Sequence, residues 1–491
     1  MKILFIYPGY ENLGIEYLSS ALIKNGHQAF LIFDPVLFNE CGSIRIRFLS
    51  SLLNYTKTIL KRIARINPDL ICFSCVSDNF KWMLDIAGKI KANFDIPIIA
   101  GGIHPTSVPD LVINNDLIDY ICVGEGDEAI VELANKMQMD NGCRIKNIWS
   151  KKEGVVIPNE VRPLIENLDS LPFPDKDLYY KEYKFFSRGY LIATSRGCPH
   201  SCTYCSNSLL REIYRDKGRY LRRRSVGNVI EELGRAIKKY KPTYVHFCDE
   251  VFTTDKIWLR EFVDLYKKNI NLPFACYSSP LFIDEQTAGL LEEGGCYKLQ
   301  IGVQTLNENT RRNLLNRWYT NQEIEQTIKI AKKNKIYLTC DNILGLPGES
   351  EQDLLEMAKF YNLNMPNHIE IFWLRYYPRT AIADKIFNPA ILKNSGPQKP
   401  ELDIKPRGIA TGGDTYRKEL AKFHFLFAIF PLLPEGIRRV ILNKRLYRFF
   451  PSLKPIWVIL LFKYLNKARF DLFTDSTMSR YIFFCRKLFK L

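Results

Sequence analysis

Short apolar runs alternate with amphipathic stretches over the first 140 residues of the chain. The apolar runs predict five strands, at residues 2–8, 28–34, 70–76, 96–102 and 120–126. The stretches between them carry apolar residues at helical spacing, as in GIEYLSSALIKNG. This alternation indicates right-handed parallel crossovers, and therefore an α/β, flavodoxin-like, doubly wound domain over residues 1–144.

A second alternation follows a segment of weak periodicity. Residues 145–185 contain the turn-rich LDSLPFPDKD, which predicts a linker lying across the surface. Six further strands are expected at 190–197, 244–250, 273–279, 298–305, 337–347 and 368–378. They describe a partial (β/α)6 barrel over residues 186–385. Both architectures bind ligands at the carboxyl ends of their strands.

Residues 386–491 show a helical pattern, with helices expected at 416–433, 435–450, 455–470 and 478–491. The net charge of the chain is +16, and residues 415–491 hold sixteen Lys or Arg against four Asp or Glu. Basic and aromatic residues interleaved at helical spacing are typical of a helix at an anionic membrane surface. Helices packed on the protein with solvated basic faces are the alternative. The apolar runs are far shorter than the roughly 18 residues that would cross a bilayer.

Thirteen cysteines, most of them single and inside apolar runs, and the lack of a secretory signal fit a reducing cytoplasm. Cys198, Cys202 and Cys205 are different, because they cluster directly after the first barrel strand. Three thiolates in C-x3-C-x2-C spacing can reach three irons of a cubane cluster, which is ordinarily held by four cysteines. An open metal position is where a substrate or cofactor coordinates. A zinc site with His200 as fourth ligand and a purely structural trio are the alternatives.

The stretch GCPHSCTYC resembles the signature of the radical S-adenosylmethionine (SAM) superfamily. Its C-x3-C-x-aromatic-C pattern is matched by Cys198, Cys202, Tyr204 and Cys205, and the resemblance covers about 186–385. It implies a [4Fe-4S] cluster whose open iron chelates SAM, and an electron donor such as flavodoxin or ferredoxin. Reductive cleavage of SAM would then give a 5′-deoxyadenosyl radical.

The resemblance also implies ligand-binding residues at the strand ends of the barrel. For SAM these are Tyr204, Asp249, Glu250, Ser278, Gln304 and Gly345. Gln304 stands in GVQT where the family often has a glutamate. For the substrate they are Tyr376 and Arg379 of YYPRT, where Arg379 is suited to an anionic group or is simply solvated.

The first domain resembles the cobalamin-binding domain that precedes the barrel in one radical SAM subfamily; GGIHPTSVPDLVINNDLIDYICVGEGDEAIVELANKM is similar to its last third. Histidine-ligated cobalamin domains carry D-x-H-x-x-G in the first loop, whereas this chain has GYENLG, with Glu11 at the histidine position. A degenerate domain is the alternative to cobalamin binding. His104 is expected to be exposed enough to touch ligand, or to cap its loop. The residues implied for cobalamin are Gly9, Glu11, Ser74, Ser77, Gly101, Gly102, His104, Gly124 and Gly126.

Cobalamin beside a radical source implies methylation of an unactivated carbon in a small or lipid-like molecule. The basic, aromatic tail is the reason to expect a lipid-like substrate. It also predicts peripheral contact of residues 415–491 with the membrane. A cobalamin-dependent cyclase or carbon–carbon coupling enzyme is one alternative. A methylthiotransferase acting on RNA is another, and it needs three further cysteines in the first domain. Those available are Cys41, Cys72, Cys75, Cys122 and Cys143. No nucleic acid partner is expected.

Overall fold

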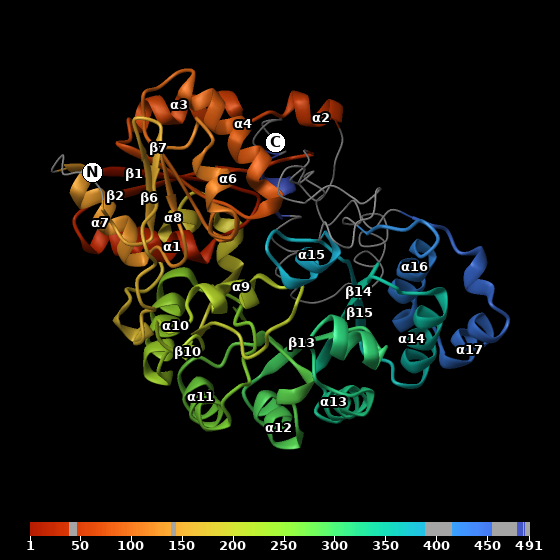
Figure 1. Cartoon of the computed structure of the whole chain (residues 1–491). Coiled ribbons are helices and arrows are strands. Elements are labelled where there is room, and N and C mark those ends of the chain that lie inside the picture. Colours follow the sequence, from red (N-terminus) through yellow and green to blue (C-terminus); the bar gives the residue numbers. More distant parts are fainter. Residues whose placement is uncertain (39–46, 139–143, 388–414, 454–478, 485, 487–491) are drawn as a thin grey trace.

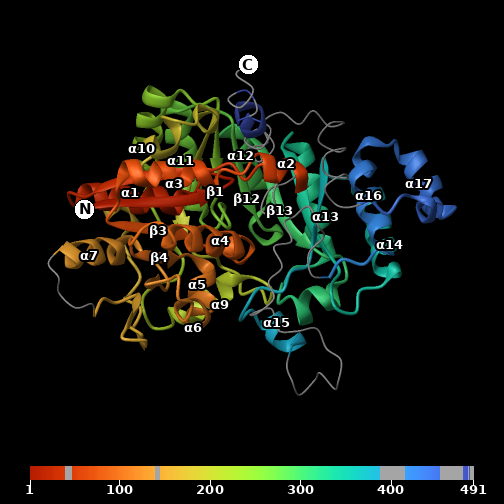
Figure 2. The ribbon, with the colours of Figure 1, turned by 90° about the horizontal axis from the view of Figure 1, so that it is seen from above.

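Two α/β domains lie against each other, and a helical region lies beside the second (Figures 1 and 2). The computed structural model describes residues 1–38, 47–138, 144–387, 415–453, 479–484 and 486. The helix expected at 455–470 falls outside these residues. Among the described residues, no helix is long and apolar enough to span a bilayer.

The first domain is built on a seven-stranded sheet of order β2-β1-β3-β4-β5-β6-β7. The first five strands are parallel, in the order expected of a flavodoxin-like sheet. The strands are β1 (Lys2–Pro8), β2 (Gln28–Asp34), β3 (Leu70–Ser74), β4 (Ile98–Gly101), β5 (Tyr120–Cys122), β6 (Ile148–Lys152) and β7 (Val155–Ile157).

Alternate residues of each strand supply two cores, one on each face of the sheet. On β1, Leu4 and Ile6 pack towards α3 and α4, whereas Ile3 and Phe5 pack towards α1 and α7 and the second domain. The helices are α1 (Leu13–Lys24), α2 (Arg47–Leu52), α3 (Thr56–Ile66), α4 (Phe80–Lys91), α5 (Ile103–Ser107), α6 (Pro109–Ile113) and α7 (Asp127–Gln138).

The segment expected to be a surface linker has a different structure. Its first part forms β6 and β7, which extend the sheet as antiparallel strands. Its second part, with α8 (Asp177–Tyr180), buries Tyr179 and Tyr183 against Phe33 of β2. Aromatic residues without periodicity gave no sign of this packing, because their partner lies far away in the sequence.

The second domain is the expected partial barrel, a parallel sheet of order β15-β14-β13-β12-β11-β8. Its strands are β8 (Gly189–Ile192), β11 (Tyr244–Phe247), β12 (Phe274–Ser278), β13 (Cys296–Gln304), β14 (Tyr337–Leu344) and β15 (His368–Trp373). The main helices are α9 (Ser206–Ile213), α10 (Val226–Tyr240), α11 (Lys256–Asn269), α12 (Glu285–Glu293), α13 (Asn321–Lys333), α14 (Glu351–Leu363) and α15 (Ala381–Ile386).

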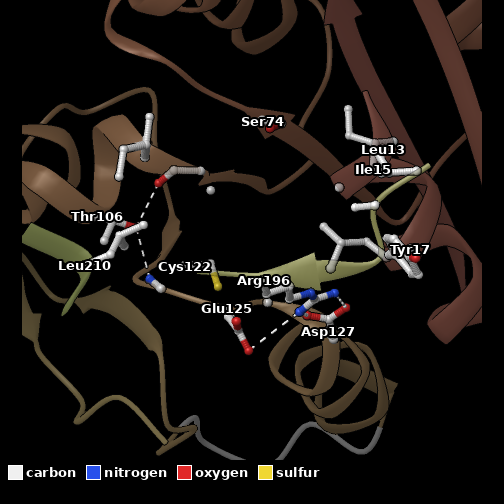
Figure 3. A pocket seen from close by; sticks show the side chains of 18 of the residues that line it. Leu13, Ile15, Tyr17, Ser74, Thr106, Cys122, Glu125, Asp127, Arg196 and Leu210 are labelled. Carbon is white, nitrogen blue, oxygen red and sulfur yellow. Dashed lines mark hydrogen bonds and ion pairs between the residues drawn. The ribbon is translucent and has the colours of Figure 1, made fainter. Parts of the chain in front are cut away.

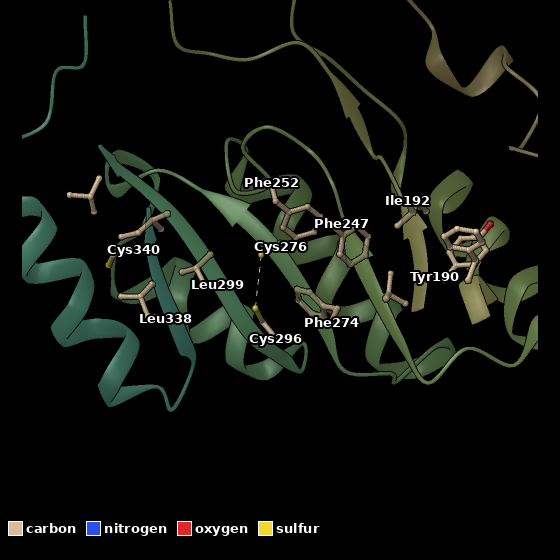
Figure 4. Close-up of a cluster of buried hydrophobic side chains, with 14 of the residues drawn as sticks. Tyr190, Ile192, Phe247, Phe252, Phe274, Cys276, Cys296, Leu299, Leu338 and Cys340 are labelled. Carbon is tan, nitrogen blue, oxygen red and sulfur yellow. Dashed lines mark hydrogen bonds between the residues drawn. The ribbon is translucent and has the colours of Figure 1, made fainter. Parts of the chain in front are cut away.

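A core of aromatic and aliphatic side chains fills the space between this sheet and its outer helices (Figure 4). Phe247, Phe252 and Phe274 pack edge to face or tilted against one another. Cys276 and Cys296 lie in this core with their Sγ atoms 4.0 Å apart. These two thiols are therefore core residues and take no part in the cysteine cluster.

The expected strand at 190–197 is split. β8 ends at Ile192, and β9 (Ser195–Arg196) turns away to form a two-stranded antiparallel ribbon with β10 (Arg222–Arg223). Gly197 follows with φ +94°, and a Cβ there would lie 2.2 Å from the Tyr220 carbonyl oxygen. The β9–β10 ribbon therefore closes the base of the cysteine loop.

The helical region packs largely on the protein. α16 (Ala421–Ile429) contributes Phe423 and Phe427 to the core beside β15, and α17 (Glu435–Asn443) lies on α14. Residues 479–484 are helical and return to the first domain, where Arg480 is fully buried and Phe484 packs against Phe33. The apolar side of 421–429 is covered, so the prediction of a membrane-surface helix is wrong there. In 479–484, Ile482 is 47% exposed, and membrane contact of this segment stays a prediction.

Candidate active site

The three clustered cysteines lie at the carboxyl end of the barrel sheet. Cys198 and Cys202 are buried, and Cys205 is half-buried at the N-cap of α9. The loop is anchored from the far side of the barrel mouth, because Thr203 donates through its N–H to the Leu315 carbonyl at 3.2 Å. The order of strand, loop and helix thus places the three cysteines on one loop at this end of the sheet, and their joint role as cluster ligands stays a prediction.

The surroundings of the thiols are poor in charge compensation. Burial raises the pKa of Cys198 to about 12, and nearby Glu250, Cys202 and Cys205 act in the same direction. Asn207 Nδ2 lies 3.8 Å from Cys205 Sγ and is a hydrogen-bond donor to it. A bound cation would offset the cost of ionising these buried thiols, since thiolates, and not thiols, are metal ligands.

Zinc with His200 as fourth ligand finds no support in the geometry. In the described part of the chain, no three His, Cys, Asp or Glu side chains converge closely enough to hold one metal ion. His200 packs edge-on against Phe282 at 5.9 Å, and burial lowers the pKa of its ring to about 4. A cubane differs from zinc in this respect, because each cysteine binds a different iron.

The lack of three converging ligands among the described residues also bears on a second cluster in the first domain. Cys72 and Cys122 are buried in the sheet core, where burial raises the pKa of both thiols, and Cys75 is buried in the opposite core. Cys41 and Cys143 lie outside the described residues. The three further thiols that a methylthiotransferase needs are thus not assembled among the described residues.

Three groups meet over Gly302 near the carboxyl end of β13. A Cβ on Gly302 would lie 2.4 Å from Gln304 Nε2 and 2.8 Å from Arg317 Nη2. The Arg317 guanidinium lies 3.4 Å from the hydroxyl of Tyr204. Gln304 has φ +69°, which turns its side chain back over the strand. Of the residues expected at SAM, Tyr204 and Gln304 are therefore brought together.

Sequence reasoning missed Arg317. Its side chain is 9% exposed, its Nε has no hydrogen-bond partner, and it forms no ion pair with a carboxylate of the described residues. Neighbouring Tyr319 and Tyr204 and the Cys202 thiol hold the pKa of Arg317 well above its ordinary value despite burial. A buried, unpaired cation beside the cysteine loop is suited to an anionic group of a ligand. NRWYT offers no local signal for this role.

Asp249 and Glu250 follow β11 but face different surroundings. Asp249 is buried and accepts hydrogen bonds from Thr194 N–H at 3.0 and 3.1 Å and from Thr194 Oγ1 at 2.7 Å, and also from Ser195 Oγ. Its carboxylate is thus occupied in fixing the start of the cysteine loop. Glu250 instead opens into the cavity described next. Because Glu250 is exposed to this cavity and Asp249 is not, Glu250 is the carboxylate of the two that a ligand can reach.

The other residues expected at SAM lie in protein contacts. Ser278 shares a 2.6 Å hydrogen bond with Thr253. Gly345 has φ +79°, and a Cβ there would lie 2.2 Å from Thr415 Oγ1, so the start of the helical region covers it. Its N–H donates to Glu349 at 2.7 Å.

A cavity of about 460 Å³ lies between the two domains, above the carboxyl ends of the first sheet (Figure 3). The first domain lines it with loop residues expected at cobalamin. These are Ser74, Gly101, Gly102, Gly124 and Gly126. The barrel lines it with residues around the cysteine loop and the end of β11, namely Ser195, Gly197, Asn207, Cys248 and Glu250. This one cavity thus borders both the loops expected at cobalamin and the residues around the cysteine loop.

Four residues expected at cobalamin lie away from this cavity. Gly9 receives a hydrogen bond on its carbonyl from buried Arg480. Glu11 forms a 2.7 Å ion pair with Lys176. His104, expected to be exposed, is fully buried and bonded to Ser77 at 3.0 Å.

The burial of His104 settles its two alternatives in favour of the loop cap. Its ring packs on Phe80 at 4.3 Å, and burial lowers its pKa to about 4. The expectation of an exposed ligand contact is wrong, because α5 turns the side chain under the β3 loop. A single sequence carries no sign of that turn.

The two residues expected at the substrate lie in different surroundings. Tyr376 packs against Phe387 at 5.1 Å and beside the small cluster that contains Leu374 and Ile382. Arg379 is exposed, in a turn with φ +55°. The structure therefore favours the solvated alternative for Arg379.

Comparison with known proteins agrees with both halves of this arrangement. A sequence model of the B12 binding domain matches residues 6–134, and one of the radical SAM superfamily matches residues 192–361. An uncharacterized methyltransferase of Pyrococcus horikoshii is 27% identical over 384 residues, which cover 73% of this chain and 77% of that protein. An anaerobic magnesium-protoporphyrin IX monomethyl ester cyclase of Rubrivivax gelatinosus is 24% identical over 405 residues, which cover 77% and 68%.

Among solved structures, the radical SAM methyltransferase TsrM of Kitasatospora setae superposes with a TM-score of 0.64 at 18% identity, over 78% of this chain and 75% of that one. It shows the same succession of folds. The chain is thus an α/β enzyme in which a B12-binding domain precedes a radical SAM domain. It belongs to the radical SAM superfamily, to the subfamily with an N-terminal cobalamin-binding domain.

Proposed function

We propose that this enzyme is a cobalamin-dependent radical SAM methyltransferase that acts on an unactivated carbon of a small or lipid-like substrate. Cys198, Cys202 and Cys205 would hold a [4Fe-4S] cluster, and SAM would bind its open iron. Cobalamin would lie in the interdomain cavity. The observation that carries the proposal is that one cavity is lined by the glycine loops of the B12-binding domain and by residues beside the cysteine loop.

The residues present fit these groups. Three thiols without a fourth leave one cluster iron open, and Arg317 and Glu250 offer a cation and an acceptor for the carboxylate and ammonium of a bound amino acid. Gly101 and Gly126 leave room for a flat ligand above the strand ends, because a Cβ on either would touch only Cys122 and Leu18, at 3.4–3.5 Å.

When bound, the cluster and cobalamin would supply the radical and the methyl carrier. The chain's own part is positioning. Asp249 fixes Thr194 and Ser195 at the entry to the cysteine loop. Asn207 donates to Cys205 Sγ, which stabilises a thiolate there. The apolar wall formed by Phe5, Leu18 and Ile99 keeps water from the cavity floor.

Among the described residues that line the cavity, none is a histidine that could bind cobalt. Glu11, at the position of the histidine ligand in other domains, is 5% exposed and is held by Lys176 and by the hydroxyl of Tyr180 at 3.0 Å. Bound cob(II)alamin is therefore expected to show an EPR spectrum without nitrogen splitting from a protein imidazole.

Anaerobic reconstitution and product analysis test the proposal. The full-length enzyme should take up one four-iron cluster and retain cobalamin, and with a reductant it should convert SAM to 5′-deoxyadenosine. Cys202→Ala should abolish cluster and product, whereas Cys248→Ala, which changes a thiol of the cavity wall outside the motif, should retain both. Two clusters per chain, or no retained cobalamin, would count against the proposal.

A cobalamin-dependent cyclase is the second candidate, because a relative of similar identity is named an anaerobic magnesium-protoporphyrin IX monomethyl ester cyclase. Methyl transfer consumes a second SAM and releases S-adenosylhomocysteine, whereas cyclisation does not. With substrate present, S-adenosylhomocysteine in step with 5′-deoxyadenosine supports methyl transfer. 5′-Deoxyadenosine alone supports cyclisation.

Membrane contact is proposed for the surface of α17 and the turn after it. Ile437, Val440 and Phe449 are 50%, 47% and 85% exposed there, and Arg445 and Arg448 lie among them. Apolar side chains ringed by cations suit an anionic lipid surface. The full chain should sediment with phosphatidylserine vesicles, and Phe449→Glu with Val440→Glu should reduce the bound fraction. Equal binding by the variant would contradict the contact.

The electron donor is proposed to dock beside the cysteine loop. Trp318 is 62% exposed, and the Arg312 guanidinium lies 5.4 Å from the centre of its ring. Trp318 Nε1 donates to Asn316, whose amide donates to Ser201 of the loop. Ser201 is next to Cys202 in the sequence. An exposed aromatic residue that lies beside a cation and is linked to the cysteine loop in this way suits an acidic flavodoxin or ferredoxin.

A further inference from the structure

Two ion pairs join the β9–β10 ribbon, whose strands precede and follow the cysteine loop in the sequence, to the loop after β5 and the start of α7 in the B12-binding domain. Arg196 Nη1 and Nη2 donate to Asp127 Oδ2 and Oδ1 at 2.8 and 2.9 Å. Arg222 Nη1 and Nη2 donate to Glu125 Oε2 and Oε1 at 3.1 and 2.5 Å. Both contacts are bidentate, so each fixes an orientation as well as a distance.

The two pairs act on one rigid unit in each domain. Arg196 and Arg222 face each other in the register of the β9–β10 ribbon. Glu125 and Asp127 are two residues apart, and Asp127 begins α7, where the helix dipole favours a carboxylate. A double contact between two short, rigid elements leaves little freedom to tilt one domain on the other.

A third contact holds the far end of the cysteine segment. The N–H of Glu125 donates to Tyr214 Oη at 2.6 Å, and Tyr214 follows α9, which begins just after Cys205. The loop after β5 thus contacts the chain two residues before Cys198 and again nine residues after Cys205. The cysteine loop is bracketed by contacts to the neighbouring domain.

Each ion pair joins one side chain that is almost fully buried to one that is partly exposed, Arg196 at 23% and Glu125 at 21%. Arg222 and Asp127 are 2% and 7% exposed as side chains, and Arg196 lies over the Tyr17 ring at 5.4 Å. Burial alone would raise the pKa of Asp127, but Arg196 holds it below its ordinary value. The same side chains form one wall of the interdomain cavity (Figure 3).

We infer that Arg196, Arg222, Glu125 and Asp127 are positioning residues that set the distance between the cobalamin cradle and the cluster loop. The inference rests on the proposed function for the identity of the two cofactors. Transfer between two bound groups requires reacting atoms about 3–3.5 Å apart, and a misplacement of about 1 Å can cost 10²-fold in rate. A small rotation between the domains would therefore uncouple methyl transfer from SAM cleavage.

The full-length enzyme with cluster and cobalamin tests this inference by EPR. In the wild type, the dipolar interaction between reduced cluster and cob(II)alamin should report one narrow distance. In the enzyme fraction that holds both cofactors, Arg196→Gln and Asp127→Asn should broaden this distance distribution. The swapped pair Arg196→Asp with Asp127→Arg should narrow the distribution of cluster–cobalt distances again. Arg162→Gln is the matched control, since Arg162 pairs with Glu132 of α7 at 2.7 Å but not with the ribbon.

Products give a second readout. In Arg196→Gln, the ratio of S-adenosylhomocysteine to 5′-deoxyadenosine formed should fall by up to about 10²-fold relative to wild type. An unchanged distance in Arg196→Gln, or an equal fall of both products, would overturn the inference.

Hydrogen exchange on the cofactor-free chain tests whether the ion pairs hold the two domains together when neither cofactor is bound. Either variant should speed exchange at 122–127 and at 195–198 together, and Arg162→Gln should not. If the wild type binds no cobalamin, the proposed function fails. The exchange data alone then decide whether the ion pairs hold the two domains, and unchanged exchange overturns that too.

Discussion

Replacing Gly124 by alanine separates two reasons for a glycine in the loop after β5. A glycine there could admit a ligand, or it could admit the neighbouring domain. In the structure Gly124 has φ +83°, and an added Cβ would lie 2.0 Å from Tyr214 Oη and 2.9 Å from Tyr214 Cζ. Tyr214 is 4% exposed and cannot move aside freely. Gly124→Ala should therefore disturb the interface before any cofactor binds.

The magnitude has two parts. A left-handed backbone costs an L-residue about 1–2 kcal/mol. Forcing a methyl group into a packed site costs about 1–3 kcal/mol more. Gly154 supplies the matched control, because it has φ +78° but nothing within 4 Å of an added Cβ. The difference between Gly124→Ala and Gly154→Ala should thus be about 1–3 kcal/mol, or roughly 2–12 °C in Tm at 2–4 °C per kcal/mol.

Thermal unfolding of the cofactor-free chain measures this difference, and a Tyr214→Ala background tests its cause. There the overlap is gone, so Gly124→Ala should cost no more than Gly154→Ala. The reasoning is refuted if both glycine variants lose the same Tm in the wild-type background. It is also refuted if truncating Tyr214 does not relieve the excess.

Further predictions concern buried charge and the electron donor. Burial raises the pKa of Glu349 to about 7. Between about pH 4.5 and 7 the folded chain therefore binds more protons than the unfolded chain, and its free energy of unfolding falls by up to about 3 kcal/mol as pH rises. Glu349→Gln should flatten this dependence of the unfolding free energy on pH, measured by urea titrations at several pH values. Lys176→Met should cost about 3–5 kcal/mol, because Glu11 and Glu16 lose the one buried cation they share; adding Glu11→Gln and Glu16→Gln should recover much of it, and no recovery would argue for lost packing instead. Trp318→Ala should raise the KM for flavodoxin without changing 5′-deoxyadenosine formation driven by dithionite; an equal loss with both reductants would show that Trp318 serves the cluster loop and not docking.

The sequence was sufficient for the order of the strands and for the cysteine loop. Buried parallel strands are short apolar runs, and these stood out clearly at β1 (KILFIYP) and β2 (QAFLIFD). The C-x3-C-x2-C motif is local, so its chemistry could be assigned before its position was known. Its place at the carboxyl end of β8 then followed from the alternation of strands and helices.

Contacts between distant residues could not be predicted. Lys176 meets Glu11 across 165 positions, and Arg480 meets Gly9 across 471. Neither member of such a pair carries a local sign of the other. The basic, aromatic terminus accordingly looked like a surface helix, although Arg480 and Phe484 complete the first domain. Arg317 escaped notice for the same reason, because Tyr204, Cys202 and Gly302, which lie near it, are distant in the sequence.

The glycines of the B12-binding domain show how far the interface shapes this site. Gly102 and Gly124 are required by protein contacts alone, since a Cβ on Gly102 would lie 2.7 Å from the Cys75 carbonyl oxygen and one on Gly124 would overlap Tyr214. Gly101 and Gly126 meet only ordinary contacts at 3.4–3.5 Å, and both line the cavity. A methyl group on either of these two would therefore be tolerated by the fold and felt by a ligand. It follows that cobalamin binding should be tested at Gly101 and Gly126, because loss of binding at Gly102 or Gly124 would report on the protein's own packing.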